Sequence, residues 1–237
     1  MKRSLIALGL SNTHLVSLSG GLCVDPDTAA AFEALIHRAA DAGFDLRGLS
    51  AFRNYDRQNQ IMNGKWLGDR PVTDAEGGVL ERGSQPDIAW RDAILRFSAL
   101  PGTSRHHWGT DLDVWDAAAV SEDYVPSLSP SEYEVCGPFA DMTHWLDERI
   151  AADDAEGFFK PYSADYGGVA PEAWHISYRP VAALYEGLAT PAMLLPLWQG
   201  KPDAMGVSHH PLAMLSVVES QAEALLERFV TITGSLQ

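Results

Sequence analysis

The sequence predicts an α+β fold in which a small antiparallel sheet is flanked by helices. Helical patterns and short strand-like runs follow one another irregularly, unlike the regular strand–helix repeat of a doubly wound parallel sheet. Of the 237 residues, 46% are apolar and 21% are charged, which is typical of a folded globular protein rather than a disordered or fibrous one. A chain of this length buries a sizeable core without disulfides.

Capping residues and helix breakers define the expected elements. Asp25-Pro26 is typical of a helix start and Gly43 of a helix end, so a helix is expected between them. By the same criteria, we expect helices at residues 25–42, 55–66, 87–100, 138–152 and 180–188, strands at 46–52, 111–115 and 174–178, and loops at 69–86 and 116–137.

The two ends of the chain differ from this pattern. Residues 4–10 form an apolar run after two basic residues, as in a signal peptide, but the run is short and polar residues interrupt it. We expect it to be a strand or an arm of the mature fold. Residues 190–211 are rich in proline and glycine, and 212–230 carry an apolar helical stripe. We therefore divide the chain into a main domain, 1–190, and an extension, 191–237, whose helix packs on that domain.

The net charge excludes several classes of partner. With 17 basic and 32 acidic residues, the chain carries a charge of −15. Such a field repels phosphate backbones and anionic lipids, so neither nucleic acid nor a membrane surface is an expected partner. No apolar run reaches the ~18 residues that a transmembrane helix needs. The carboxylates and the eight histidines remain available as metal ligands.

Two cysteines are too few for a disulfide framework. No C-x-x-C pair occurs, so a thiolate zinc site is excluded. We expect Cys23 and Cys136 to be two buried apolar thiols, and a single bridge between them stays open.

A first group of metal-ligating residues lies in the segment S-R-H-H-W-G-T-D-L-D, residues 104–113. It offers one or two imidazoles, and a carboxylate follows seven residues after the first. Gly109 argues against a helix, so a loop that leads into a strand is expected. Asp111 and Asp113 would then lie on one face of that strand.

A second group lies in the segment P-E-A-W-H-I-S-Y, residues 171–178, where Glu172 precedes His175 by three residues. Two imidazoles, one carboxylate and a water complete a tetrahedral catalytic zinc site, and a nearby glutamate can take a proton from the water. This combination predicts metal-assisted hydrolysis, most naturally of an amide. Taken singly, each of these residues is more often structural, so the prediction depends on the combination.

These motifs resemble a known family. The pattern S-x-H-x-x-G-x-x-x-D followed by E-x-W-H is similar to that of the zinc D-alanyl-D-alanine carboxypeptidases of the VanY type, which share a superfamily with lysostaphin and the hedgehog signalling domain. Residues 50–58 resemble the S-x-Y-R-S-x-x-x-Q segment of the same family. Together the matches span residues 45–180.

The resemblance implies a role for each matching residue. His106, Asp113 and His175 would bind Zn²⁺, and Glu172 would be the general base and later the acid toward the leaving amine. His107 competes with His106 as a ligand, but the spacing favours His106.

The remaining matches concern the substrate. Arg53 would face the substrate carbonyl or carboxylate, Ser104 and Gln58 would contact the terminal D-residue, and Trp174 would form a wall of the site. The family usually has a small residue where this chain has Asp111, which leaves two alternatives: a partner that orients a ligand imidazole, or an exposed strand residue.

The resemblance implies a zinc-dependent D-alanyl-D-alanine carboxypeptidase that hydrolyses the terminal D-residue of peptidoglycan stem peptides or muropeptides. Its catalytic domain would be residues 1–190, with the zinc site in a cleft on the sheet. The alternatives are a lysin-like endopeptidase, an L,D-carboxypeptidase and a zinc-holding binding module without turnover. The family favours the periplasm or cell wall, whereas the lack of a clear signal peptide leaves the cytoplasm open. The oligomeric state is not predicted.

Overall fold

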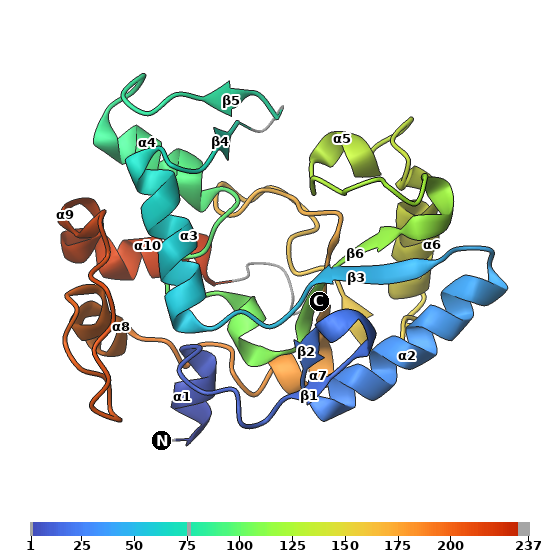
Figure 1. Ribbon diagram of the computed structural model, residues 1–237, viewed down its shortest axis with the longest axis horizontal. Coiled ribbons are helices and arrows are strands. Elements are labelled where there is room, and N and C mark those ends of the chain that lie inside the picture. Colours follow the sequence, from blue (N-terminus) through green and yellow to red (C-terminus); the bar gives the residue numbers. More distant parts are fainter. Residues whose placement is uncertain (1, 75–76, 232–237) are drawn as a thin grey trace.

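A computed structural model describes residues 2–74 and 77–231 of the protein (Figure 1). Its helices are α1 (Lys2–Ala7), α2 (Pro26–Asp41), α3 (Tyr55–Leu67), α4 (Asp87–Leu95), α5 (Pro130–Tyr133), α6 (Ala140–Ala151), α7 (Arg179–Ala182), α8 (Pro191–Trp198), α9 (Leu215–Val218) and α10 (Ala222–Phe229). Its strands are β1 (Val16–Ser17), β2 (Cys23–Val24), β3 (Leu46–Ser50), β4 (Val72–Thr73), β5 (Val79–Leu80), β6 (Asp111–Asp116), β7 (Phe158–Phe159) and β8 (His175–Tyr178). Four short 3-10 helices include η2 (Arg105–Trp108) and η4 (Glu219–Gln221).

The central sheet has four antiparallel strands in the order β3-β6-β8-β7. In its register, Asp113 lies opposite Ser50 on β3 and opposite His175 on β8. The pairing of β3 with β6 is irregular between Gly48 and Ser50, next to this point. The predicted α+β class with a small antiparallel sheet is confirmed.

The two larger of the three hydrophobic clusters in the described part of the chain lie on opposite sides of the molecule. The first joins the sheet to α2 and α6, with residues such as Leu35, Leu112 and Leu146. The second joins α3 and α4 to the C-terminal helices α8–α10, with residues such as Trp90 and Trp198. Figure 1 shows the sheet, α2 and α6 on one side and α3, α4 and α8–α10 on the other.

The N-terminal segment is a helix, so the expected strand or arm is wrong. In α1, Ile6 and Ala7 pack against Trp108 and Tyr185. The indole Nε1 of Trp108 also donates a hydrogen bond to the carbonyl oxygen of Ala7 at 3.2 Å. This tertiary contact stabilises a segment that is too short to be helical alone. None of the described helices is long and apolar enough to cross a membrane.

The extension holds more helical segments than the single helix expected at 212–230. Residues 191–198 form α8, in which Pro191 occupies the first turn, where a missing N–H costs little. The helix predicted at 212–230 breaks into α9, η4 and α10. At the break, the Arg91 guanidinium on α4 donates to the carbonyl oxygen of Val217 and to Oε1 of Gln221, both at 2.8 Å.

Several other elements are shorter or more numerous than expected. The strand expected at 46–52 ends at Ser50, the helix at 87–100 ends at Leu95, and the helix at 180–188 is regular only to Ala182. The helix at 138–152 begins at Ala140. The expected loops hold the β4–β5 hairpin and α5, although residues 75–76 lie outside the described part, and β7 was not predicted.

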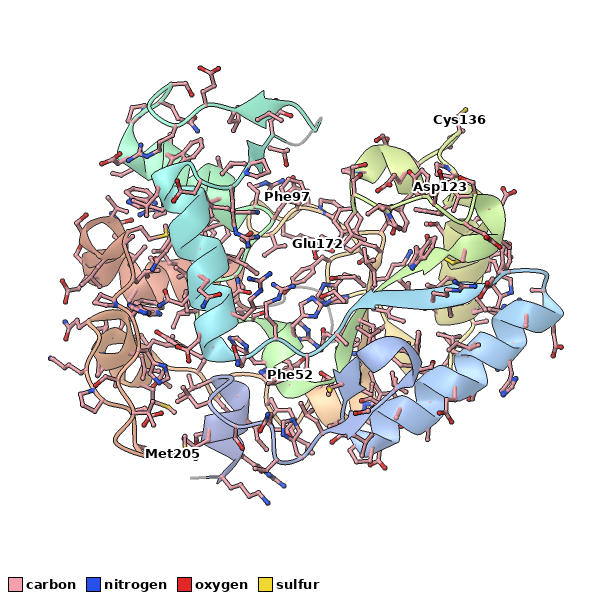
Figure 2. The ribbon with its side chains drawn as sticks, viewed as in Figure 1. Phe52, Phe97, Asp123, Cys136, Glu172 and Met205 are labelled. Carbon is pink, nitrogen blue, oxygen red and sulfur yellow. The ribbon has the colours of Figure 1, made fainter. Side chains whose placement is uncertain are left out.

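Both cysteines are free, so the structure contains no bridge between them. Cys23 is half-buried, but Cys136 is exposed, and the expectation of two buried thiols is wrong. Cys136 lies in the turn after α5, at the edge of the molecule in Figure 2, and its φ of 79° is in the left-handed region.

Candidate active site

Three metal-ligating side chains meet on the central sheet. His106 lies in η2, Asp113 in β6 and His175 in β8. One ligand atom from each lies within 4.8 Å of the other two, and all three residues are buried. The antiparallel register places Asp113 opposite His175, whereas His106 arrives from the turn that precedes β6. This group could hold a metal ion.

The orientation of His106 is fixed by the main chain. Its Nδ1 lies 2.8 Å from the carbonyl oxygen of Ala51. Because a carbonyl only accepts hydrogen bonds, Nδ1 carries the proton. The lone pair of Nε2 is then free and points into the group, 3.5 Å from Asp113 Oδ2.

His175 is oriented by a carboxylate. Its Nε2 lies 2.9 Å from Oδ1 of Asp111, and its Nδ1 lies 3.1 Å from Oε2 of Glu172 and 3.6 Å from Oδ1 of Asp113. Burial alone would lower the pKa of His175, but the hydrogen bonds to Asp111 and Glu172 raise it to about 10. The Nδ1 edge thus faces two carboxylates, an environment that attracts a cation.

The donor set fits Zn²⁺. Two imidazoles and one carboxylate, with a fourth position left for water, are the ligands of many catalytic zinc sites. Each imidazole also gives its other ring N–H to an acceptor, the Ala51 carbonyl for His106 and the Asp111 carboxylate for His175. Such partners fix the tautomer of a zinc-binding histidine.

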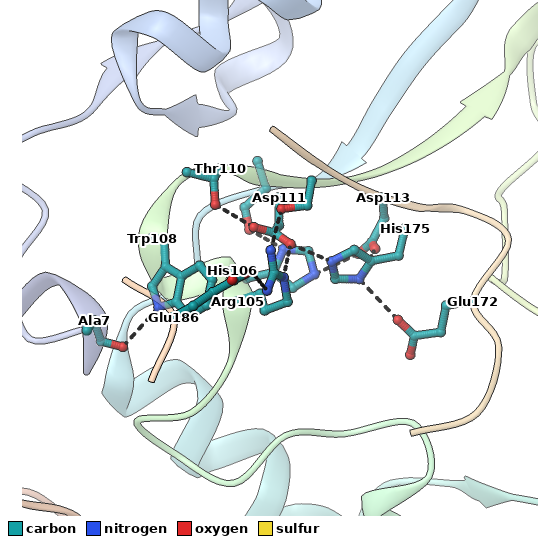
Figure 3. Close-up of polar contacts among 12 residues, drawn as sticks. Ala7, Arg105, His106, Trp108, Thr110, Asp111, Asp113, Glu172, His175 and Glu186 are labelled. Carbon is teal, nitrogen blue, oxygen red and sulfur yellow. Dashed lines mark hydrogen bonds and ion pairs between the residues drawn. The ribbon is translucent and has the colours of Figure 1, made fainter. Parts of the chain in front are cut away.

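An ion-pair network centred on the buried Arg105 holds Asp111 in place (Figure 3). Nε of Arg105 donates to Oδ1 of Asp111 at 2.9 Å, and its other nitrogens contact Glu186 at 3.0 Å and the hydroxyl of Ser177 at 2.7 Å. Burial alone would raise the pKa of Asp111, but Arg105 and His175 lower it below its usual range. Asp111 is therefore ionised and accepts the hydrogen bond from His175.

The metal-binding group opens into a cleft of 480 Å³ between the two cores. Figure 2 shows Glu172 and Phe97 near the centre of the molecule, between α3 and the sheet. One rim carries residues next to β4, and the other carries residues 127–130 next to α5. The predicted site residues that line the cleft are Arg53, Ser104, His106, Asp113, Glu172, Trp174 and His175.

Arg53 is held in the cleft by neutral groups. Its guanidinium donates to Oε1 of Gln58 at 2.7 Å, and its main-chain N–H donates to the carbonyl oxygen of His106 at 3.0 Å. Burial lowers the pKa of Arg53, while the negative charges of Asp113 and Glu172 oppose this effect. Among the described residues, Arg53 forms no ion pair, so its charge is available to a ligand.

Comparison with known proteins agrees with this geometry. The family model described as VanY, D-alanyl-D-alanine carboxypeptidase, matches residues 21–181. The chain belongs to the VanY family. A protein of Haemophilus influenzae, described only as uncharacterized, is 34% identical over 104 residues, which are 43% of this chain and 77% of the relative.

Two solved VanY structures share the fold. VanYB in complex with D-alanine-D-alanine is 22% identical with a TM-score of 0.51, and the match covers 72% of this chain and 79% of that one. A variant of the D,D-pentapeptidase VanY in complex with Zn(II) is 23% identical with a TM-score of 0.50, and that match covers 72% of this chain and 80% of the other. The family and its peptidase class are thus confirmed, and the buried group of His106, Asp113 and His175 fits the expected zinc cofactor.

The structure assigns different roles to the two candidate histidines of the VanY motif, His106 and His107. His107 is fully buried: its Nδ1 donates to the carbonyl oxygen of Arg53 at 2.6 Å, and its Nε2 accepts from the N–H of Gly102 at 3.1 Å. Burial lowers the pKa of His107 to about 3, so it stays neutral. His107 supports the main chain at Arg53, and His106 faces the metal-binding group.

Two predicted roles depend on exposure, and both residues are buried: Gln58, expected to contact the substrate, and Asp111, for which an exposed strand position was one alternative. Gln58 is 1% exposed, and its amide bridges Arg53 and the carbonyl oxygen of Ala99, the latter at 2.6 Å. Asp111 is fully buried against His175. Of the two alternatives for Asp111, the structure therefore supports the orienting partner.

Sequence reasoning missed several residues of this VanY site. Arg105 lies inside the first motif, and its position beside the ligand was the only available signal. Tyr162 packs edge-on against His175, with ring centroids 5.1 Å apart, and its carbonyl oxygen accepts from the N–H of Glu172 at 2.9 Å. Lys65 and Arg70 also line the cleft. No motif marks Tyr162, Lys65 or Arg70.

Proposed function

We propose that the protein is a D-alanyl-D-alanine carboxypeptidase, which removes the terminal D-residue from peptidoglycan stem peptides or muropeptides. The observation that carries the proposal is the place of Arg53: a half-buried guanidinium that forms no ion pair with any described residue, in the same cleft as the histidine–aspartate group. A substrate with a free terminal carboxylate needs such a cation, whereas cleavage within a peptide does not.

The ligand roles follow from the geometry. His106, Asp113 and His175 would hold Zn²⁺ through His106 Nε2, an Asp113 oxygen and His175 Nδ1. When bound there, Zn²⁺ supplies a Lewis acid for the scissile carbonyl and acidifies the attacking water. Asp113 keeps its negative charge, because His106 and His175 lower its pKa although burial alone would raise it.

Glu172 is proposed to move the proton. Its carboxylate borders the metal-binding group, since Oε2 lies 3.1 Å from Nδ1 of His175. From this position it can take the proton of the attacking water and give it to the leaving amine. The presence of such a base next to the ligands favours an enzyme over a binding module without turnover.

The other cleft residues are proposed to bind the terminal D-residue. Arg53 would pair with its carboxylate, and Gln58 would act through Arg53 by holding the guanidinium in place. Ser104 would offer its hydroxyl, and the indole of Trp174 would form an apolar wall. The site of action would be wherever these peptides occur: the periplasm, the cell wall, or the cytoplasm if muropeptides are imported.

A substrate panel tests the function. The zinc-loaded protein is incubated with a pentapeptide that ends in D-Ala-D-Ala, a tetrapeptide that ends in L-residue–D-Ala, and a cross-linked dimer, each with and without a chelator. Mass spectrometry identifies the products. We expect release of D-Ala from the pentapeptide, abolished by the chelator. Cleavage of only the tetrapeptide would indicate an L,D-carboxypeptidase instead, and cleavage of only the dimer would indicate an endopeptidase. If none of the three peptides were cleaved, the proposal of an enzyme would be rejected.

A further inference from the structure

The cleft carries more positive charge than one terminal carboxylate requires. Arg53, Lys65 and Arg70 all line it, although the protein as a whole has a charge of −15. Among the described residues, none of the three forms an ion pair. Arg105, a fourth cation of the lining, is paired with Asp111 and Glu186 and is thereby neutralised.

A charge balance shows the excess. Asp113 and Glu172 contribute two negative charges at the metal-binding group, which a divalent zinc ion would balance. Three positive charges then remain in the cleft, and the terminal carboxylate of a peptide compensates only one. Unpaired cations that lie close together repel one another, so an arrangement of this kind is more typical of a binding site than of a structural one.

The helix α3 fixes the position of Lys65. Lys65 follows Gln58 by seven residues, so both lie on the same face of the helix, about 10 Å apart along its axis. The Lys65 ammonium donates to the hydroxyl of Ser98 at 2.7 Å and forms no ion pair with any residue that the structure describes. Burial lowers the pKa of Lys65 to about 8; Glu172 opposes this effect, and Arg53 and Arg70 add to it.

The end of the same helix fixes Arg70. Gly68 caps α3 in a left-handed conformation, with a φ of 88°, and the main-chain N–H of Arg70 donates to the carbonyl oxygen of Gly64 at 3.1 Å. The aliphatic stem of Arg70 lies against Gly64, where an added Cβ would come within 3.0 Å of Arg70 Cδ. The missing side chain at Gly64 therefore gives the arginine room to lie along the helix.

We propose that Lys65 and Arg70 form a second anion subsite, which binds a side-chain carboxylate of the substrate peptide in addition to the terminal carboxylate at Arg53. This inference rests on the proposed function, because it assumes a peptide in the cleft. Gln58, which holds the Arg53 guanidinium, lies about 10 Å from Lys65 along α3, the length of roughly three residues of extended peptide, so the carboxylate would belong to a residue before the C-terminal one. Two sources share this chemistry: a diaminodicarboxylic residue in place of lysine, and a glutamate with a free α-carboxylate.

Calorimetry with non-hydrolysable peptides tests the subsite. In these pentapeptides a ketomethylene group replaces the scissile amide. The first pair differs only in a diaminodicarboxylic residue against lysine, and the second only in a free against an amidated glutamate carboxylate. We expect the zinc-loaded protein to bind the acidic member of one pair at least about tenfold more tightly, as a charge-assisted hydrogen bond warrants. The pair that shows the preference identifies the source.

Variants assign the preference to the two residues. Lys65→Met and Arg70→Gln should each reduce the preference for the acidic peptide to about threefold or less. Lys65→Arg, which keeps the positive charge, should retain the preference. Arg57→Gln, on the exposed face of α3, and Lys201→Met, on the surface of the extension, should leave it unchanged. Because Arg70 is exposed, its loss does not threaten the fold.

The outcomes separate the subsite from the activity. Equal affinity within both pairs, or a preference that survives both Lys65→Met and Arg70→Gln, would overturn the subsite. An intact preference together with no turnover of any cleavable peptide would support the subsite and reject the proposed carboxypeptidase.

Discussion

Oδ1 of Asp111 lies 2.9 Å from Nε2 of His175, and both side chains are buried. Arg105 holds the same carboxylate oxygen at 2.9 Å, so Asp111 is an ionised acceptor. A proton of His175 is thereby held on Nε2, so Nδ1 is the ring nitrogen that would bind a metal ion in the cleft once its own proton is displaced. This arrangement accounts for an aspartate at a position where the VanY motif usually has a small residue.

The first prediction concerns this contact. Asp111→Asn keeps the shape of the side chain but removes its charge, which weakens the orientation of His175. We expect zinc affinity to fall by about 10- to 100-fold, the usual effect of losing such a partner. Competition with a chromophoric chelator measures the affinity. Asp123→Asn, at an exposed position, is the matched control, and equal zinc affinities for both variants would contradict the role of Asp111.

The second prediction concerns Glu172. Glu172→Gln preserves volume but removes the basic carboxylate, so kcat should fall by about 10²- to 10⁴-fold. Zinc stoichiometry should stay at one ion per chain, because the three proposed ligands are untouched. Single-turnover rates and metal analysis of the same sample check both statements. A variant with full activity would exclude Glu172 as the base.

The third prediction concerns Arg53 and the terminal carboxylate. Arg53→Ala should lower kcat/KM for a peptide acid by about 100-fold, because a charged hydrogen-bonding partner is lost. For the same peptide with a C-terminal amide, the substitution should change little. Gln58→Ala should lower kcat/KM less and in the same pattern, since it loosens Arg53 without removing it. Equal losses on acid and amide would show that Arg53 does not bind the carboxylate.

The metal-binding group could be predicted because its members lie in two short motifs. His106 and Asp113 are seven residues apart, and Glu172 and His175 are three residues apart. The orientation of each imidazole could not be predicted. It depends on Ala51 and on the pairing of β6 with β8, which are contacts between segments far apart in the sequence.

The rest of the site could not be predicted for the same reason. The partners of Arg105 include Glu186, 81 residues away, and no local pattern links the two. Lys65 lies in the last turn of α3 and Arg70 in the turn between α3 and β4, and both reach the cleft through the way α3 ends at Leu67. In the extension, no helix was expected within the proline- and glycine-rich stretch 190–211, whereas burial of Trp198 stabilises α8 there.

The last prediction concerns the extension. We propose that residues 191–231 do not fold apart from the rest, because Trp198 is fully buried in the core of α3 and α4 and its Nε1 donates to the carbonyl oxygen of Pro101 at 2.9 Å. Trp198→Ala should therefore lower the free energy of unfolding by about 3–5 kcal/mol, as for other buried tryptophans. Chemical denaturation should show one transition by fluorescence and by circular dichroism for both proteins. Since Pro101 lies three residues before Ser104, activity should be lost within that same transition. Two separate transitions, with activity retained after the first, would instead make the extension an independent unit.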